Sequence, residues 1–168
     1  MTTRTELLAT DMFRGYHRVF VDKLTKIESE LAGVVAQGGG WREGLPGFRH
    51  LLVLLETDVE HFINEEERLI LERLRARVGM TPVLHDCYRE HGEIRLETER
   101  FHRTLVAAAC GHPSESLFEY AASLIDLLRV HMAREDEVLF LAAEQELTHQ
   151  ELLQISAQSP AWPTHRAA

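Results

Sequence analysis

"RVHMAREDEVLF", residues 129–140, places a histidine and a glutamate where an amphipathic helix should bury apolar side chains. An earlier stretch, "VEHFINEEERLI", residues 59–70, repeats the same His-x-x-x-Glu spacing. Residues four apart share one face of an α-helix. In both stretches the histidine and the glutamate, which are His131 and Glu135 in the later one, lie on the same helix face as a row of apolar residues. The sequence therefore predicts a helical fold whose core is interrupted twice by polar pairs.

The equivalent pair of the earlier stretch is His61 and Glu65. With ten histidines in the chain, two such spacings arise easily by chance, and an exposed i,i+4 pair is the simpler interpretation. Burying a carboxylate is costly, however, unless it is paired, protonated or bound to a metal ion. The position of both pairs on apolar helix faces favours a buried and functional arrangement.

Length and composition indicate one domain of an ordinary globular protein. The chain has 168 residues, enough for one substantial core. Its formal charge of −9, from 18 basic and 27 acidic residues, argues against nucleic acid as a partner. No apolar run reaches membrane-spanning length, and the first residues lack the apolar segment of a signal peptide. Cys87 and Cys110 make no disulfide framework, so we expect a cytoplasmic protein without a membrane partner.

Glycine and proline divide the chain into four long segments with helical apolar periodicity. Thr81 is expected to cap the third segment, with Pro82 in its first turn. The expected helices cover residues 5–36, 46–78, 82–109 and 116–146. We therefore predict an all-α fold, an antiparallel up-down-up-down four-helix bundle over residues 1–146. Residues 147–168 are expected to form a loosely held C-terminal tail.

Each of the four expected helices carries a histidine on or near its inward face. In antiparallel helices joined by short loops, residues equally far from a loop lie at the same height. Counting from each loop at about 1.5 Å per residue places six side chains in one layer, with mismatches of about 6–8 Å. The predicted ligands of a metal centre are His17, His61, Glu65, His91, His131 and Glu135. A satisfied polar layer without metal is the alternative.

The number and kind of these side chains indicate which metal they would bind. Four imidazoles and two carboxylates exceed the needs of one tetrahedral zinc ion. They suit two adjacent ions that prefer octahedral coordination, with the carboxylates as bridges and positions left open. We therefore expect two iron ions as the cofactor, with manganese as the alternative.

The same residues resemble the pattern of the hemerythrin-like family, the HHE cation-binding domains, over about residues 10–145. The matching motifs are His17, "HFINE" (residues 61–65), the His91 of "REHGEI", and "HMARE" (residues 131–135). The resemblance implies a four-helix bundle with a non-haem di-iron site that binds O2 or a related small ligand.

Two departures from the family pattern bear on the chemistry. Oxygen-carrying hemerythrins have a second histidine on the third helix, four residues from the first, where this chain has Cys87 and Arg95. The missing imidazole implies a more open metal position. The family's last carboxylate lies five residues after the final histidine, which is Asp136 here, whereas Glu135 keeps the helical face. Both carboxylates stay candidates.

Other side chains near the predicted layer have a structural interpretation beside a functional one. His85 is a surface histidine or the alternative ligand on the third helix. Asp58 is an ion-pair partner or a carboxylate that orients an imidazole. Cys87 is a small core residue or a thiolate ligand. Tyr16 and Tyr88 pack in the core or line the ligand pocket.

Three functions are compatible with this sequence. The first is binding of O2 or a related small ligand at the di-iron site, for sensing, storage or transport. The second is a di-iron redox enzyme acting on hydrogen peroxide or nitric oxide, which the missing imidazole and Tyr88 favour. The third is a metal-free interaction bundle. A sensor would need a separate protein partner, and a homo-oligomer is equally compatible with the sequence.

Overall fold

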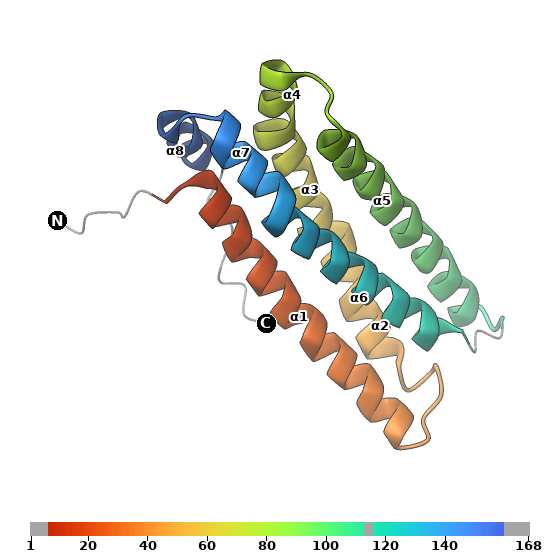
Figure 1. Cartoon of the computed structure of the whole chain (residues 1–168). Coiled ribbons are helices and arrows are strands. Elements are labelled where there is room, and N and C mark those ends of the chain that lie inside the picture. Colours follow the sequence, from red (N-terminus) through yellow and green to blue (C-terminus); the bar gives the residue numbers. More distant parts are fainter. Residues whose placement is uncertain (1–6, 113–115, 160–168) are drawn as a thin grey trace.

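In the described part of the chain, two unbroken helices and two segmented ones form the long helices of the fold (Figure 1). The computed structural model describes residues 7–112 and 116–159, where every regular element is helical. The unbroken helices are α1 (Ala9–Ala36) and α5 (Pro82–Ala109). The segmented helix after α1 consists of α2 (Leu45–Val53), the π turn η1 (Leu54–Val59), α3 (Glu60–Glu66), the π turn η2 (Glu67–Leu71) and α4 (Glu72–Val78). The segmented helix after α5 consists of α6 (Leu117–Arg134), the π turn η3 (Glu135–Leu139) and α7 (Phe140–Glu146). The prediction of an all-helical bundle is confirmed.

The long helices pack around one shared core. In Figure 1 the chain reverses direction at each of the three connections between them. α1 contacts α2 and α6, and α5 contacts the same two helices from the other side. The third long helix begins as the sequence predicts, because the Thr81 hydroxyl accepts a hydrogen bond from the Leu84 N–H at 3.4 Å. Among the described helices, none is long and apolar enough to cross a membrane.

A further helix, α8 (His149–Gln158), lies where the sequence predicts a loosely held tail. Thr148 and Glu151 form a complete capping box at its start. Leu152 and Ile155 are buried, and α8 packs against α1. The described part of the tail is therefore an ordered addition to the bundle. The rest of the predicted tail, residues 160–168, lies outside the described residues.

The π turn η1 changes which residues of the second long helix face the core. A π turn contains one more residue than an α turn, so it shifts the inward stripe by one position. The buried stripe therefore runs from Leu55 and Val59 through Ile63 to Glu66 and Ile70. Without η1, the segment would be a regular α-helix, and His61 and Glu65 would face the core as the sequence periodicity predicts.

Candidate metal centre

Five buried polar side chains meet inside the bundle, and every long helix contributes to them. They are His17 of α1, Glu66 of α3, His91 of α5, His131 of α6 and Glu135 of η3. Each is at most 4% exposed to solvent. Glu66, His91, His131 and Glu135 offer potential ligand atoms that all lie within 4.8 Å of one another. Among the described residues this group has the composition and spacing to hold a metal ion.

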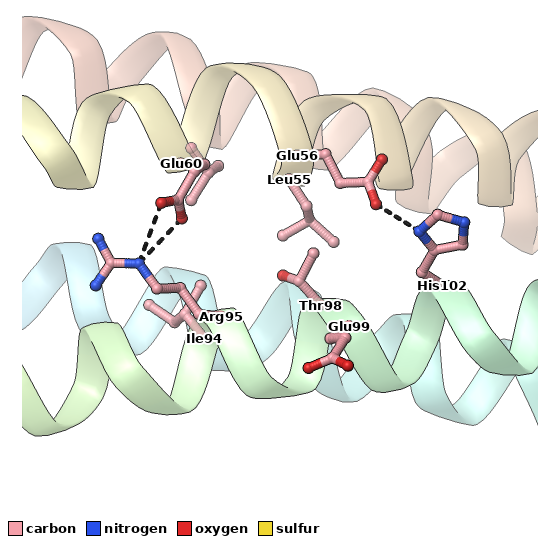
Figure 2. Close-up of a pocket in the computed structure, with 9 residues that line it drawn as sticks. Leu55, Glu56, Glu60, Ile94, Arg95, Thr98, Glu99 and His102 are labelled. Carbon is pink, nitrogen blue, oxygen red and sulfur yellow. Dashed lines mark hydrogen bonds and ion pairs between the residues drawn. The ribbon is translucent and has the colours of Figure 1, made fainter.

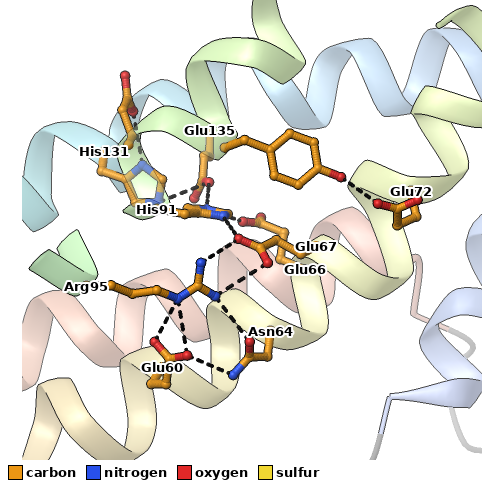
Figure 3. Close-up of polar contacts among 11 residues, drawn as sticks. Glu60, Asn64, Glu66, Glu67, Glu72, His91, Arg95, His131 and Glu135 are labelled. Atoms are coloured by element: carbon orange, nitrogen blue, oxygen red, sulfur yellow. Dashed lines mark hydrogen bonds and ion pairs between the residues drawn. The ribbon is translucent and has the colours of Figure 1, made fainter. Parts of the chain in front are cut away.

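The Glu135 carboxylate lies at the middle of the cluster. Its Oε1 is 3.1 Å from His91 Nε2 and 3.1 Å from His131 Nε2. Its Oε2 is 3.3 Å from His17 Nε2. Glu66 approaches from the opposite helix, with Oε2 3.3 Å from His91 Nε2 (Figure 3). Glu66, His91 and His131 therefore direct ligand atoms at a common space beside Glu135 Oε1, and His17 approaches the other carboxylate oxygen, Oε2.

Several of these inward atoms lie at ion-pair distances from one another but make no hydrogen bond among the described residues. They are Nε2 of His17, Nε2 of His131, both carboxylate oxygens of Glu66, and Oε2 of Glu135. The Nε2 of His91 can serve one acceptor and bonds to Glu135, so it leaves Glu66 without a donor. Buried polar atoms are rarely left unpaired, because the desolvation cost is not recovered. Unpaired nitrogens and carboxylate oxygens that face one another fit the donor set of a metal ion.

The outer nitrogen of every imidazole in the cluster contacts a carboxylate. Nδ1 of His17 lies 2.8 Å from Asp136, and Nδ1 of His91 lies 2.9 Å from Glu67. The same atom of His131 lies 3.1 Å from Glu90, which also contacts Arg89 and Arg134. A carboxylate on Nδ1 fixes the tautomer and turns the Nε2 lone pair toward a metal. In all three rings, the carboxylate on Nδ1 therefore sets the direction in which Nε2 points.

The pKa values of the cluster reflect two carboxylates buried side by side. Burial and the neighbouring charge of Glu135 raise the pKa of Glu66 to about 7. Burial acts in the same direction on Glu135, but three imidazoles outweigh it and hold its pKa well below the usual value. Two anionic groups at this depth need positive charge, which either protons on the imidazoles or a bound cation can supply.

Aromatic rings enclose the His17 side of the cluster. The His17 ring stacks on Phe140 with centroids 5.4 Å apart and lies 5.0 Å from Phe62. Phe13 packs edge-on against Phe62 at 5.3 Å. This apolar wall excludes water from the imidazole and holds its plane.

The structure brings together four of the six sequence-predicted ligands, namely His17, His91, His131 and Glu135. The other two, His61 and Glu65, are not in the cluster. His61 is exposed, and Glu65 makes an ion pair with Arg68 at 2.8 Å. The physical reason is the π turn η1, which turns both side chains off the inward stripe and brings Glu66 into it.

The remaining candidates take positions around the cluster. Asp136 contacts the outer nitrogen of His17, so it orients that ring. His85 is exposed, and Asp58 pairs with Lys23 at 2.5 Å. Cys87 is buried, and burial together with the charges of Glu135 and Glu66 raises the pKa of its thiol. It does not belong to the group of atoms that lie within 4.8 Å of one another.

The two predicted pocket tyrosines have structural contacts. Tyr16 packs edge-on against Phe13 and Phe62 at 6.2 and 6.1 Å. The Tyr88 hydroxyl lies 3.0 Å from Glu72 and donates to it. Burial and this carboxylate raise the pKa of Tyr88 to about 12. Both contacts favour the packing interpretation over the pocket one.

Three functional candidates, Glu66, Glu67 and Glu90, were missed by sequence reasoning. A shift in the helical register places Glu66, and contacts between helices place the other two. The acidic run "NEEE" is visible in the sequence, but it does not indicate which glutamate faces inward.

Two hollows lie near the cluster and differ in chemistry. A small apolar cavity of about 10 Å³ adjoins His131, the one polar residue in its lining, and is otherwise bounded by Phe20, Leu24, Val59, Phe62, Ile63, Leu128 and Met132. A larger surface groove of about 330 Å³ runs along α5, with Glu60 and Arg95 near one end and Glu56 and His102 near the other (Figure 2). The groove is lined by none of the five clustered residues.

The comparison with known families agrees with this architecture. The sequence profile of the hemerythrin HHE cation binding domain matches residues 8–143, which include the whole cluster. The chain therefore belongs to the hemerythrin HHE cation-binding family. Neither the curated proteins nor the solved structures give a significant match.

Proposed function

We propose that this protein is a non-haem di-iron protein that binds O2 or a related small ligand inside the bundle. The observation that carries the proposal is the set of unpaired buried atoms that face one another between the helices. They are imidazole nitrogens and carboxylate oxygens, the donors that iron accepts. Bound iron would supply an open coordination position and one-electron redox chemistry.

The arrangement of Glu135 supports a pair of ions over a single one. Its Oε1 faces His91 and His131, whereas its Oε2 faces His17. A carboxylate whose oxygens face opposite ways suits a bridge between two ions. His91 and His131 would hold one ion with Glu66, and His17 would hold the other.

The small apolar cavity beside His131 supports a small and weakly polar ligand. Its walls are apolar, and both nitrogens of the His131 ring already contact carboxylates, so a polar solute would lose its hydration without compensation. This favours O2 or nitric oxide over hydrogen peroxide. Phe20, Phe62 and Met132 would keep water from the ligand side of the centre.

A redox enzyme is the second candidate, and one observation favours it. The clustered residues supply a single imidazole, His17, on the Oε2 side of Glu135. An ion held by so few protein groups would keep several positions open for a reactant. Turnover of peroxide or nitric oxide by the iron-loaded protein separates this function from pure ligand binding.

Metal content tests the proposal directly. Protein reconstituted with ferrous iron without air, and then desalted, should contain close to two irons per chain by elemental analysis. Exposure to air should then produce near-ultraviolet absorption that zinc-loaded protein lacks. A chain that retains no metal after reconstitution would leave the cluster as a polar layer and the protein as a metal-free bundle.

Metal binding should release protons. Burial alone would lower the imidazole pKa values, but carboxylate contacts outweigh it. Contacts with Asp136 and Glu135 raise the pKa of His17 to about 9. Contacts with Glu135, Glu66 and Glu67 raise the pKa of His91 to about 11. Both rings are therefore protonated near neutral pH in the metal-free protein, and each must lose a proton to offer Nε2 to a metal.

We accordingly expect the apparent affinity for zinc, a redox-inert probe, to fall as the pH is lowered. A titration in weak buffer with an indicator dye should detect about two protons released per chain. Zinc binding without proton release, with an affinity independent of pH, would contradict this account of the cluster.

A further inference from the structure

Arg95 makes an unusually complete set of contacts on one side of the cluster. Its Nη1 donates to Glu67 Oε1 at 2.9 Å, and its Nη2 donates to Asn64 Oδ1 at 3.1 Å. Its Nε donates to Glu60 at 3.1 Å. These hydrogen bonds hold the guanidinium of α5 against α3 and against Glu67, the first residue of η2 (Figure 3).

The contact with Glu67 connects Arg95 to the buried centre. Glu67 Oε1 lies 2.9 Å from Arg95 Nη1 and 2.9 Å from His91 Nδ1, so one oxygen joins both groups. His91 is fully buried, and its other nitrogen lies among the inward atoms. The orientation of this ring therefore depends on a carboxylate that is itself 24% exposed.

Geometry and charge give Arg95 a role at this carboxylate. A partly exposed glutamate side chain has several rotamers, and most of them would release the imidazole. Arg95 removes that freedom because Glu60 and Asn64 hold the guanidinium in place. Arg95 also donates to both carboxylate oxygens of Glu67, to Oε1 at 2.9 Å and to Oε2 at 3.4 Å. The Glu67 carboxylate, held in this way, accepts the Nδ1–H of His91 and leaves Nε2 free for a metal.

We propose that Arg95 is a positioning residue of the metal centre, which acts through Glu67 to fix the tautomer and the orientation of His91. This inference rests on the proposed metal-binding function. Arg95 does not touch the centre, so its removal should weaken metal binding without removing a ligand. A carboxylate that contacts a ligand directly, as Glu67 contacts His91, is typically worth 10–100-fold in metal affinity, so we expect the loss of Arg95, one contact further out, to cost about the lower end of that range.

The test compares two arginines of the same helix. Arg95→Gln should lower the affinity for Co²⁺ about tenfold and shift the cobalt absorption bands. Arg100→Gln removes the same charge from an exposed position whose hydrogen bond is to Glu97, at 2.6 Å, and should bind Co²⁺ like the wild type. Arg95→Lys keeps the charge but not the several contacts, and should recover part of the affinity.

The outcomes separate this inference from the proposed function. Equal cobalt affinity and spectra for Arg95→Gln and Arg100→Gln would overturn the role of Arg95 while leaving the metal site intact. A wild-type chain that binds no cobalt would overturn both. Thermal unfolding of the metal-free variants shows whether the fold survives. If Arg95→Gln does not fold, Glu67→Gln tests the same connection, with the same loss of affinity expected.

Discussion

Replacing Glu135 by glutamine should nearly abolish metal binding. Among residues 7–112 and 116–159, the Glu135 carboxylate is the one group in contact with the inward nitrogens of all three imidazoles, at 3.1, 3.1 and 3.3 Å. Glutamine has almost the same shape, but it carries no charge and offers one oxygen in place of two. A centre built around a shared carboxylate would lose its bridge. We expect a decrease in affinity of at least about 100-fold, the upper end for residues that merely support a ligand.

The matched control is Glu137→Gln, two residues further along the same π turn and exposed to solvent. It removes the same charge without touching the cluster. Elemental analysis after ferrous reconstitution should give almost no iron for Glu135→Gln and the wild-type amount for Glu137→Gln. Retention of a full complement of iron by Glu135→Gln would refute the central position of this carboxylate.

The metal-free form of the same variant should also be less stable. Glu135 is 1% exposed and is the counter-charge for protonated imidazoles on both of its sides. Removing one member of a buried ion pair typically costs about 3–5 kcal/mol, since the other charge stays buried without compensation. The loss of affinity must therefore be measured at a temperature where the metal-free variant is folded, as its thermal unfolding curve shows.

Helix positions could be predicted from the sequence because their signals are local. Glycine, proline and apolar spacing placed the long helices within a few residues of where they lie. Thr81 caps α5 as its position before a proline indicated. The capping box that starts α8 is equally local, but the short apolar pattern of Leu152 and Ile155 was not recognised beside the proline-rich end of the chain.

The candidate site could be predicted only where the helical period is regular. His17 and His91 lie on unbroken α-helices, so a count of 3.6 residues per turn finds their inward faces. His131 and Glu135 precede η3 or begin it, so this π turn does not disturb their spacing. The second long helix contains η1 before its acidic run, and no simple sequence rule signals a π turn there. The carboxylates of Glu67 and Glu90 reach the Nδ1 atoms of His91 and His131 from a neighbouring helix. A count along one helix cannot reveal such contacts.

The adjacent glutamates of that acidic run offer the sharpest test of the register. Glu66 is fully buried, with both carboxylate oxygens unpaired among the described residues and Oε2 3.3 Å from His91 Nε2. Glu65, one position earlier, is 17% exposed and paired with Arg68. Glu66→Gln should therefore lower iron content and zinc affinity strongly, by at least about tenfold. Glu65→Gln should leave both near wild-type values, since it removes only an i,i+3 surface pair.

These two variants have the same composition and the same net charge, so a difference between them can arise only from position. In a regular α-helix Glu65 would face the core, and Glu66 would turn about 100° away from it. The π turn reverses that assignment. If Glu65→Gln loses the metal while Glu66→Gln keeps it, the second helix is regular in solution and His61 returns as a ligand. If Glu66→Gln loses it, the extra residue of η1 is what completes the centre, because it brings the second carboxylate opposite His91.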